Sequence, residues 1–491
     1  MSLRVEQGLR VIRAVAERAD PTAPLAVGDI AAGVGMPLSA VSRLCSELNG
    51  LGMLERGTAY GSYRLGRTAI RLSGRAAAPF AHAVQYALTL AAQQTGETAC
   101  LAARSGQGIR VVAAIGSAWT LHSPAAVGEL IAESRSAIAQ ALSVEQVGGD
   151  EMDGVDVLDG VNGDGARHFE STIGMSVEIA VPVRASTGEC IAVLAVRLPS
   201  NRAHHTGPPA RRALDVARRT IESAVEHWTD SVRPTASEAR HPEPAQHPEP
   251  AQQTPHALDA AVRILTHLAE GGDSIAGITR ATGLRADRAQ RLLESCRRAG
   301  YILVSPHAAQ FQLAWNLHGW HRAAAAPTLT ERGKPLVAHA ANITRTCGFL
   351  TVLAGMRSFT LVEELEMVGD GLQMTSWLGR AHPLIGSDSG PVLAMNFSPA
   401  EITRLFPARN TPQEQERFLR HVRRAVRDDV LSMQGFDGAG IQSISAPVRD
   451  SSGSVVAAAC IVGTTDYIAS NAVAFEKVVR ELAAGATALL A

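Results

Sequence analysis

The sequence lacks the features of several protein classes. Its six cysteines are scattered without a C-x-x-C pair, so their spacing predicts neither a zinc site nor a disulfide framework. The longest apolar run, Val455–Val462, is far shorter than the roughly 20 residues that cross a bilayer. The first residues have arginines within their apolar stretch and no signal-peptide pattern. We therefore expect a soluble, cytoplasmic protein with no membrane partner, metal or cofactor.

Net charge is also nearly absent, at −1 from 46 basic and 47 acidic side chains. This balance excludes a uniformly basic nucleic-acid binder, but it does not exclude a local basic surface. Apolar residues make up 46% of the chain, which is enough for several packed cores. At roughly 150 residues per domain, a chain of 491 residues is expected to hold about three domains, give or take one.

A proline-rich segment divides the chain into two halves. Residues 230–254 contain HPEPAQ twice in tandem and few apolar side chains, so they should form an extended tether. The halves resemble each other: segments 33–54 and 281–302 share glycine, arginine and leucine positions, and both halves later carry A-x-P-V-R. This similarity indicates an internal duplication at the scale of whole domains.

Each half opens with a pattern typical of a helix-turn-helix unit. Apolar residues at helical spacing, followed by a glycine turn and a longer helix that ends at Gly52 or Gly300, outline such a unit. Two short strands at 53–56 and 62–65 would form a wing. Arginines outnumber acidic residues in both units, as expected for DNA binding. The expected helices are 8–18, 27–34 and 38–51 in the first half, and 258–269, 275–282 and 286–299 in the second.

The remainder of each half has α/β character. A helix (81–95 or 336–346), apolar strands with Gly-containing hairpin turns, and a closing helix (211–228 or 472–490) predict a mixed sheet flanked by helices. The expected domains are helix-turn-helix units at 1–75 and 255–322, α/β units at 76–229 and 323–491, and the linker at 230–254.

The segment GMPLSAVSRLCSELNGLGML (Gly35–Leu54), followed by SYRLG (Ser62–Gly66), resembles the DNA-binding module of the IclR family of bacterial transcriptional regulators. The late block ISAPVRDSSG is similar to that family's effector domain. The resemblance implies an α/β multidomain fold with two winged helix-turn-helix modules, each followed by a GAF-like effector-binding domain. It also implies ligand-responsive transcription regulation, with repression as the expected sign.

Two modules in one chain imply a covalent pseudo-dimer or a homo-oligomer on a double-stranded DNA operator. By resemblance, the DNA-binding residues are Ser39, Ala40, Ser42, Arg43 and Arg64 in the first half, and Arg285, Asp287, Arg288, Gln290 and Arg291 in the second. Because Asp287 would repel phosphate, the two half-sites should not be identical. The alternative is that the second module has become structural.

The resemblance places the effector site in the second half, at Ser387, Asp388, Ser389, Asp437, Ser443 and Cys460. The first half has Glu178 where the second has Ser443, so it lacks the small polar lining. An organic acid or an aromatic compound would fit the family. Since Asp388 disfavours a carboxylate, a neutral hydroxylated ligand is an equal alternative. A further alternative is that both pockets are filled and that Ser443 and Cys460 are ordinary core residues. A separate alternative for the whole protein is a small-molecule-binding scaffold in which one or both DNA modules have become structural.

The sequence shows no sign of an enzyme. Cys460 lies in an apolar strand without an adjacent base, where a thiol is expected to be inert. Neither a G-x-S-x-G motif nor a phosphate-binding loop is present. We therefore expect no catalytic residues.

Overall fold

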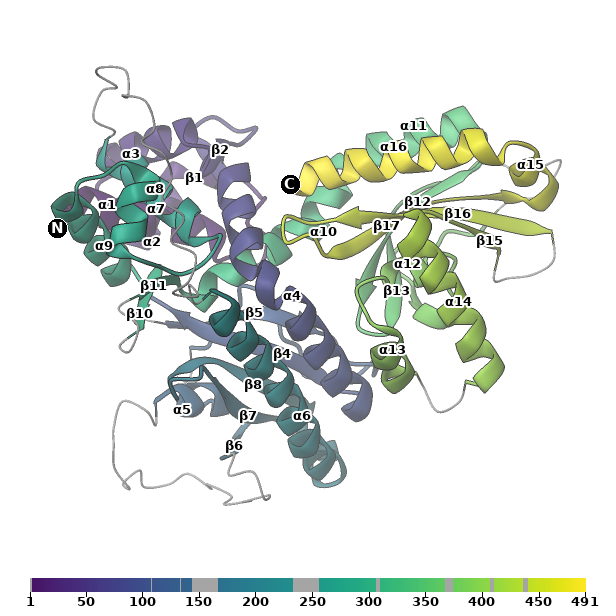
Figure 1. Cartoon of the computed structure of the whole chain (residues 1–491), viewed down its shortest axis with the longest axis horizontal. Helices are drawn as coiled ribbons and strands as arrows, with labels where there is room; N and C mark the ends of the chain where they lie inside the picture. The colour runs from purple at the N-terminus through teal and green to yellow at the C-terminus, as the bar shows by residue number, and fades with distance from the viewer. Residues whose placement is uncertain are drawn as a thin grey trace.

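The computed structural model describes residues 2–106, 108–132, 134–143, 167–232, 256–305, 310–366, 374–406, 410–435 and 440–491. The predicted linker lies outside the described residues from residue 233 onward. Figure 1 shows two small helical units beside the N-terminus and two separate sheets, each covered by helices.

The first helical unit combines three helices with a small antiparallel sheet. Its elements are α1 (Leu3–Ala16), β1 (Leu25–Ala26), α2 (Val27–Val34), α3 (Leu38–Gly50), β2 (Leu54–Arg56) and β3 (Ser62–Leu65). The strand order is β1-β3-β2. Gly35 has a φ of 64°, the left-handed conformation that glycine adopts most easily, and it makes the turn between α2 and α3. The predicted glycine turn is therefore present.

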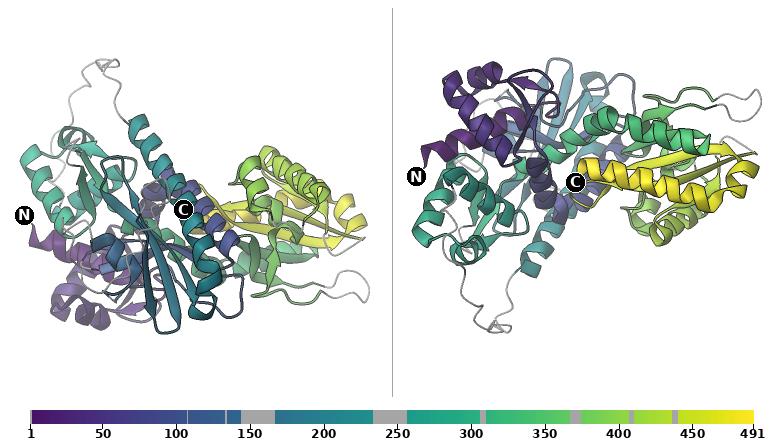
Figure 2. Two further views of the ribbon diagram at one scale, coloured as in Figure 1. Left: turned by 90° about the horizontal axis from the view of Figure 1, so that it is seen from below. Right: turned by 90° about the horizontal axis from the view of Figure 1, so that it is seen from above.

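The second helical unit has the same order of elements. It comprises α7 (Ala257–Leu268), β9 (Asp273–Ser274), α8 (Ile275–Thr282), α9 (Ala286–Arg298), β10 (Ile302–Ser305) and β11 (Gln310–Leu313). The strand order is β10-β11-β9. Gly283, with a φ of 69°, makes the turn between α8 and α9. Figure 2 shows the two units side by side.

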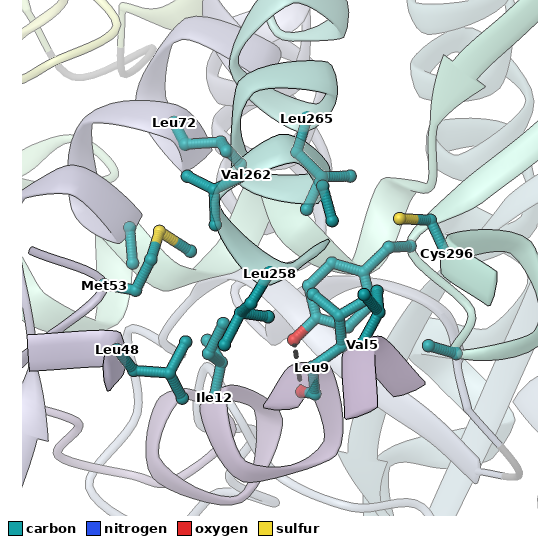
Figure 3. Close-up of a cluster of buried hydrophobic side chains, with 14 of the residues drawn as sticks. Val5, Leu9, Ile12, Leu48, Met53, Leu72, Leu258, Val262, Leu265 and Cys296 are labelled. Carbon is teal, nitrogen blue, oxygen red and sulfur yellow. Dashed lines mark hydrogen bonds between the residues drawn. The ribbon is translucent and has the colours of Figure 1, made fainter. Parts of the chain in front are cut away.

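A single hydrophobic core joins the two helical units. Buried residues of α1 and α3 pack with buried residues of α7 and α9 in one continuous cluster (Figure 3). The Tyr301 hydroxyl donates a hydrogen bond of 2.7 Å to the Leu9 carbonyl, across the boundary between the halves. At Gly8 an added Cβ would lie 2.8 Å from Leu258 Cδ1, so α1 and α7 approach too closely for a larger residue.

The first sheet belongs to the first half. Its elements are α4 (Arg67–Thr95), β4 (Thr98–Ser105), β5 (Gly108–Ile115), α5 (Ala137–Ser143), β6 (Phe169–Ile173), β7 (Ser176–Arg184), β8 (Cys190–Pro199) and α6 (Ser200–Val232). The strand order is β5-β4-β8-β7-β6, and every pair is antiparallel. The prediction of a mixed sheet is therefore wrong. Hairpins connect β4 to β5 and β6 to β7, and the two strands of a hairpin are antiparallel. Helices α4 and α6 are also longer than predicted.

The second sheet has the same central order, with one more edge strand. Its order is β14-β13-β12-β17-β16-β15, and its ladders are antiparallel. Helices α11 and α16 cover one face, and α12, α13 and α14 lie on the other (Figure 1). The elements are η1 (Trp315–Gly319), α10 (Trp320–Arg332), α11 (Lys334–Thr344), β12 (Cys347–Ala354), β13 (Arg357–Glu364), β14 (Ala381–Pro383), η2 (Leu384–Gly386), α12 (Gly390–Leu393), α13 (Pro399–Leu405), α14 (Pro412–Asp428), β15 (Leu431–Gln434), β16 (Ile441–Arg449), β17 (Val455–Thr464), α15 (Thr465–Ser470) and α16 (Ala472–Leu490).

The connection from helical unit to sheet differs between the halves. In the first half, α4 is one unbroken helix of 29 residues. In the second, the chain forms η1, α10 and α11, with a break at Gly333 followed by Pro335 in the first turn of α11. Proline is accepted there because its missing N–H would have no partner within the helix. The second sheet consequently does not repeat the placement of the first, and it lies on the far side of α4 (Figure 1).

A buried polar cluster attaches α4 to the second half. The Ser73 hydroxyl donates to the Leu317 carbonyl and accepts from the His321 backbone N–H at 3.0 Å. His321 Nδ1 lies 3.0 Å from the same hydroxyl, and its Nε2 lies 3.5 Å from Asp450 Oδ2. A Ser-His-Asp set can activate a nucleophile, but here all three side chains are buried and the serine proton is directed to a carbonyl. This arrangement is structural.

We expect this junction to weaken at acidic pH through His318. The ring is buried against Phe80 and Trp315, and burial, with Arg322 nearby, lowers the pKa of His318 from 6.5 to about 3. Below pH 6.5, His318 is therefore protonated in the unfolded chain but stays neutral in the folded chain. The free energy of unfolding consequently falls as pH decreases from 6.5 towards 3. Urea unfolding at about pH 5 should show a loss of about 2 kcal/mol from this group relative to pH 7.5.

The matched variant for this prediction is His318→Phe, which keeps the stacked ring and removes the titrating group. Its free energy of unfolding should depend less on pH than that of the wild-type chain, by the same amount. Equal pH dependence of the two proteins would show that His318 is not buried in a neutral form.

Candidate functional site

The face of α3 predicted to contact DNA is exposed. Ser39, Ser42 and Arg43 are exposed and Ala40 is half-buried. The opposite side of the helix packs into the shared core through Val41, Leu44, Cys45 and Leu48. Hydroxyl groups and one guanidinium on a free helix face can bond phosphates or base edges in a major groove.

The corresponding face of α9 has different chemistry. Arg285, Asp287, Gln290 and Arg291 are exposed and Arg288 is half-buried. Arg291 Nη2 lies 3.1 Å from Asp287 Oδ2, one helical turn away. The acidic residue that departs from the family pattern is therefore paired with the neighbouring arginine, and it reduces the positive charge of this helix.

The structure corrects the prediction for Arg64. Its side chain is only 17% exposed and lies between Glu55 of β2 (3.4 Å) and Glu331 of α10 (3.7 Å), so it faces the second half rather than the outside of the wing. The exposed residues of the wing include Arg56 and Tyr60, neither of which was predicted to contact DNA. An arginine and a tyrosine next to the turn glycines could have indicated them.

A cavity of about 1140 Å³ lies against the second α/β unit, which supplies most of its lining. Four predicted effector residues line it: Ser387, Asp388, Ser389 and Cys460. Ser443 does not line it, because its side chain is buried in β16, where the hydroxyl lies 3.4 Å from the Met433 carbonyl. The predicted Asp437 lies outside the described residues.

The other walls of the cavity were not predicted. Apolar and aromatic side chains form much of the lining, with polar groups from α14 and the strand ends. They include Phe349, Met356, Met374, Trp377, His382, Asn410, Glu414, Arg417, Phe418, His421 and Met433. Further lining comes from the first half, at Thr89, Ala92, Gln93, Gly96 and 115–118.

The pKa values of two groups that line the cavity, Cys460 and His421, are shifted by burial. Burial, with Asp388 nearby, raises the pKa of the Cys460 thiol well above its usual value, so this thiol is an inert wall residue. Burial, together with Arg417, Arg424 and Arg420, lowers the pKa of His421, which therefore stays neutral at neutral pH.

The corresponding space in the first α/β unit is occupied by an ion pair. Glu178 accepts hydrogen bonds from the Ser136 hydroxyl and the Ile138 N–H (3.1 Å), and it lies 2.9 Å from Arg197 Nε. Glu178 and Arg197 are register partners in β7 and β8, as Ser443 and Val462 are in β16 and β17. At these positions the second unit has a small and an apolar side chain, whereas in the first unit a charged pair fills the space.

Within the described ranges, no group of three or more His, Cys, Asp or Glu side chains could hold a metal ion. No helix in this part of the chain is long and apolar enough to cross a membrane.

Comparison with known proteins places two segments in one family. Residues 5–57 match the IclR helix-turn-helix domain, and residues 328–489 match the bacterial transcriptional regulator IclR C-terminal domain. No curated protein matches the chain. The matches therefore fall on the first helical unit and on the unit that contains the cavity.

Several solved structures are similar to about half of the chain. The IclR transcriptional regulator of Alicyclobacillus acidocaldarius has 18% identity and a TM-score of 0.30, with 49% of this chain and 100% of that chain covered. The IclR of Thermotoga maritima has 16% identity and a TM-score of 0.30, covering 48% and 98%. An IclR homologue from Microbacterium hydrocarbonoxydans, complexed with 4-hydroxybenzoate, has 20% identity and a TM-score of 0.30, covering 48% and 99%.

The two domain matches agree with the exposed recognition helix and with the cavity of the second α/β unit. The chain therefore contains an IclR helix-turn-helix domain at residues 5–57 and a bacterial transcriptional regulator IclR C-terminal domain at residues 328–489.

Proposed function

We propose that the protein is a ligand-responsive repressor that arose by duplication and binds its operator as a covalent pseudo-dimer. Each half would combine a winged helix-turn-helix with a GAF-like domain. The observation that carries the proposal is the single core shared by the two helical units, which leaves α3 and α9 exposed together. Two DNA-reading helices held in one rigid body bind two half-sites without the entropic cost of assembling a dimer.

The half-sites would differ in sequence. On α3, Ser39 and Ser42 precede Arg43. At the same positions α9 has Asp287 and Gln290 before Arg291. Glutamine prefers adenine, and a carboxylate accepts from cytosine, so the two helices favour different bases. Asymmetric operators follow from this difference.

The test is selection of bound sequences from random duplex DNA, followed by footprinting of Arg43→Ala and Arg291→Ala. Each loss of a base-reading arginine should cost about 1–3 kcal/mol, or roughly 5- to 150-fold in affinity, and should relax specificity in one half-site only. Arg423→Ala on α14 is the control, because it removes one exposed arginine far from both recognition helices. If no sequence is enriched, the DNA-binding proposal is wrong.

A second candidate is that the α9 module is structural and that only α3 reads DNA. The ion pair between Asp287 and Arg291 favours this candidate, since it occupies the arginine that would reach the groove. Under it, Arg291→Ala would bind DNA like the wild-type chain while Arg43→Ala would not. A reporter gene downstream of the selected operator then decides between repression and activation.

A further inference from the structure

The large cavity lies on the boundary between the two halves rather than within one domain. We infer that the effector is held between the second α/β unit and the first half, and that it is a neutral, hydroxylated aromatic molecule of at least two rings. The inference rests on the proposed function in one respect: it takes the occupant of this cavity to be the regulatory ligand.

The first half forms a fixed wall of the cavity. Gln93 and Gly96, at the end of α4, and residues 115–118 after β5 contribute to the lining. Arg357 Nη2 of the second half donates a hydrogen bond of 3.0 Å to the Ala118 carbonyl at this wall. At Gly355 an added Cβ would lie 2.9 Å from the Ile115 side chain, so the two halves are in close contact beside the opening.

Contacts along α4 hold this wall in place. Tyr86 and Leu90 of α4 belong to the same buried cluster as Val392 and Phe397 of the second half. The Asn396 side-chain amide donates a hydrogen bond of 2.9 Å to Gln85 Oε1. A ligand that touches Gln93 therefore contacts a helix that is already packed on the ligand-binding unit.

The lining selects a neutral aromatic ligand. Phe349, Trp377 and Phe418 provide flat apolar surfaces, and a volume of about 1140 Å³ is large for a single-ring molecule. The lining carries charges of both signs, with Asp388 and Glu414 opposed to Arg417, so a ligand with a single charge of either sign meets a like charge as well as an opposite one. A hydroxyl group has no such conflict, since it donates to a carboxylate and accepts from a guanidinium.

Two residues that line the cavity, His382 and Thr89, each have a buried polar atom without a hydrogen-bond partner among the described residues. His382 Nε2 is buried beside Trp377, with the two ring centroids 4.2 Å apart, and it has no hydrogen-bond partner among the described residues. Burying such an atom without a partner costs free energy, so a ligand hydroxyl that reached the imidazole after a rotation of its side chain would gain a hydrogen bond with either tautomer.

The position of the wall also couples the cavity to DNA binding. Only Gly66 separates strand β3 of the wing from α4, and an added Cβ there would lie 2.2 Å from the Gly52 carbonyl oxygen, so this connection is tight. Helix α4, with 29 residues and a length of about 43 Å, connects the cavity wall at Gln93 directly to the first wing. Ligand binding and DNA binding are then linked in both directions.

The test uses the full chain without DNA and compares Gln93→Trp with Gln94→Trp. Gln93 lines the cavity, whereas its neighbour Gln94 is exposed and does not. The probes are dihydroxynaphthalene, which is neutral, and hydroxynaphthoate, which differs by a carboxylate, and their affinity is measured by calorimetry. The wild-type chain and Gln94→Trp should bind one equivalent of the neutral probe, and Gln93→Trp should bind it at least about tenfold more weakly.

Three outcomes would overturn the inference. Wild-type affinity in Gln93→Trp would show that the first half is not a wall of the site. Tighter binding of the naphthoate, or no binding of the neutral probe to the wild-type chain, would show that the ligand class is wrong. If Gln93→Trp does not fold by circular dichroism, Ser117→Phe replaces it, since Ser117 also lines the cavity. Failure to bind DNA would refute the proposed function and leave these binding results intact.

Discussion

Replacing Leu258 by aspartate is expected to disrupt both helical units at once. Leu258 is fully buried, and it contacts Gly8 at the point where α1 and α7 meet. A carboxylate at this position would be an unpaired buried charge, which costs about 3–5 kcal/mol. Because one core serves both units, we expect a lower midpoint of urea unfolding and loss of hydrogen-exchange protection in both α1 and α7.

The control for this prediction is Leu258→Met, which conserves volume and polarity and should cost less than about 1.5 kcal/mol. If Leu258→Asp lost protection only in α7, the two units would be independent in solution. The proposal of a rigid pseudo-dimer would then fail, because its affinity depends on the two recognition helices being held together.

Replacing Glu17 by leucine is expected to have a comparable effect at another boundary. The carboxylate lies at the end of α1, accepts hydrogen bonds from Ser105 and Asn316, and forms ion pairs with Arg110 (2.8 Å) and Arg13 (3.5 Å). Its side chain is 4% exposed. Removing it leaves two arginines without their buried partner. We expect a loss of about 2–4 kcal/mol in free energy of unfolding, since both arginines keep some contact with water.

Glu47→Leu provides the comparison for Glu17→Leu. Glu47 pairs with Arg4 at the surface, and exposed pairs contribute about 0–1 kcal/mol. If the two variants were equally stable, the cluster around Glu17 would not be formed in solution. Because Asn316 belongs to the second half, Glu17→Leu should also loosen the contact between the halves.

Local sequence signals were sufficient for the two helical units. The second helix of each unit and the glycine turn after it lie where the spacing predicts them, at 27–34 and 275–282. The exposed faces of α3 and α9 follow from the same apolar periodicity, because one helix side is needed for the core. These features depend on interactions between residues a few positions apart, and such interactions can be predicted directly from the sequence.

Longer helices and strand directions were predicted less well. Helix α4 begins at Arg67 rather than 81, and α6 begins at Ser200 rather than 211 and passes through Pro208 and Pro209. Packing of α4 against α6 and α10 stabilises these extensions where propensity alone does not. The antiparallel order of both sheets depends on which strands pair with one another, and no local sequence pattern predicts that pairing.

The candidate site divides in the same way. Short sequence motifs were enough to predict the exposed residues of α3 and α9 and four residues of the cavity lining, Ser387, Asp388, Ser389 and Cys460. Only the tertiary structure decided that Arg64 faces Glu331 and that Gln93 borders the cavity. Both contacts join residues from different halves of the chain, and the free energy that selects them comes from packing between the halves rather than from local conformation.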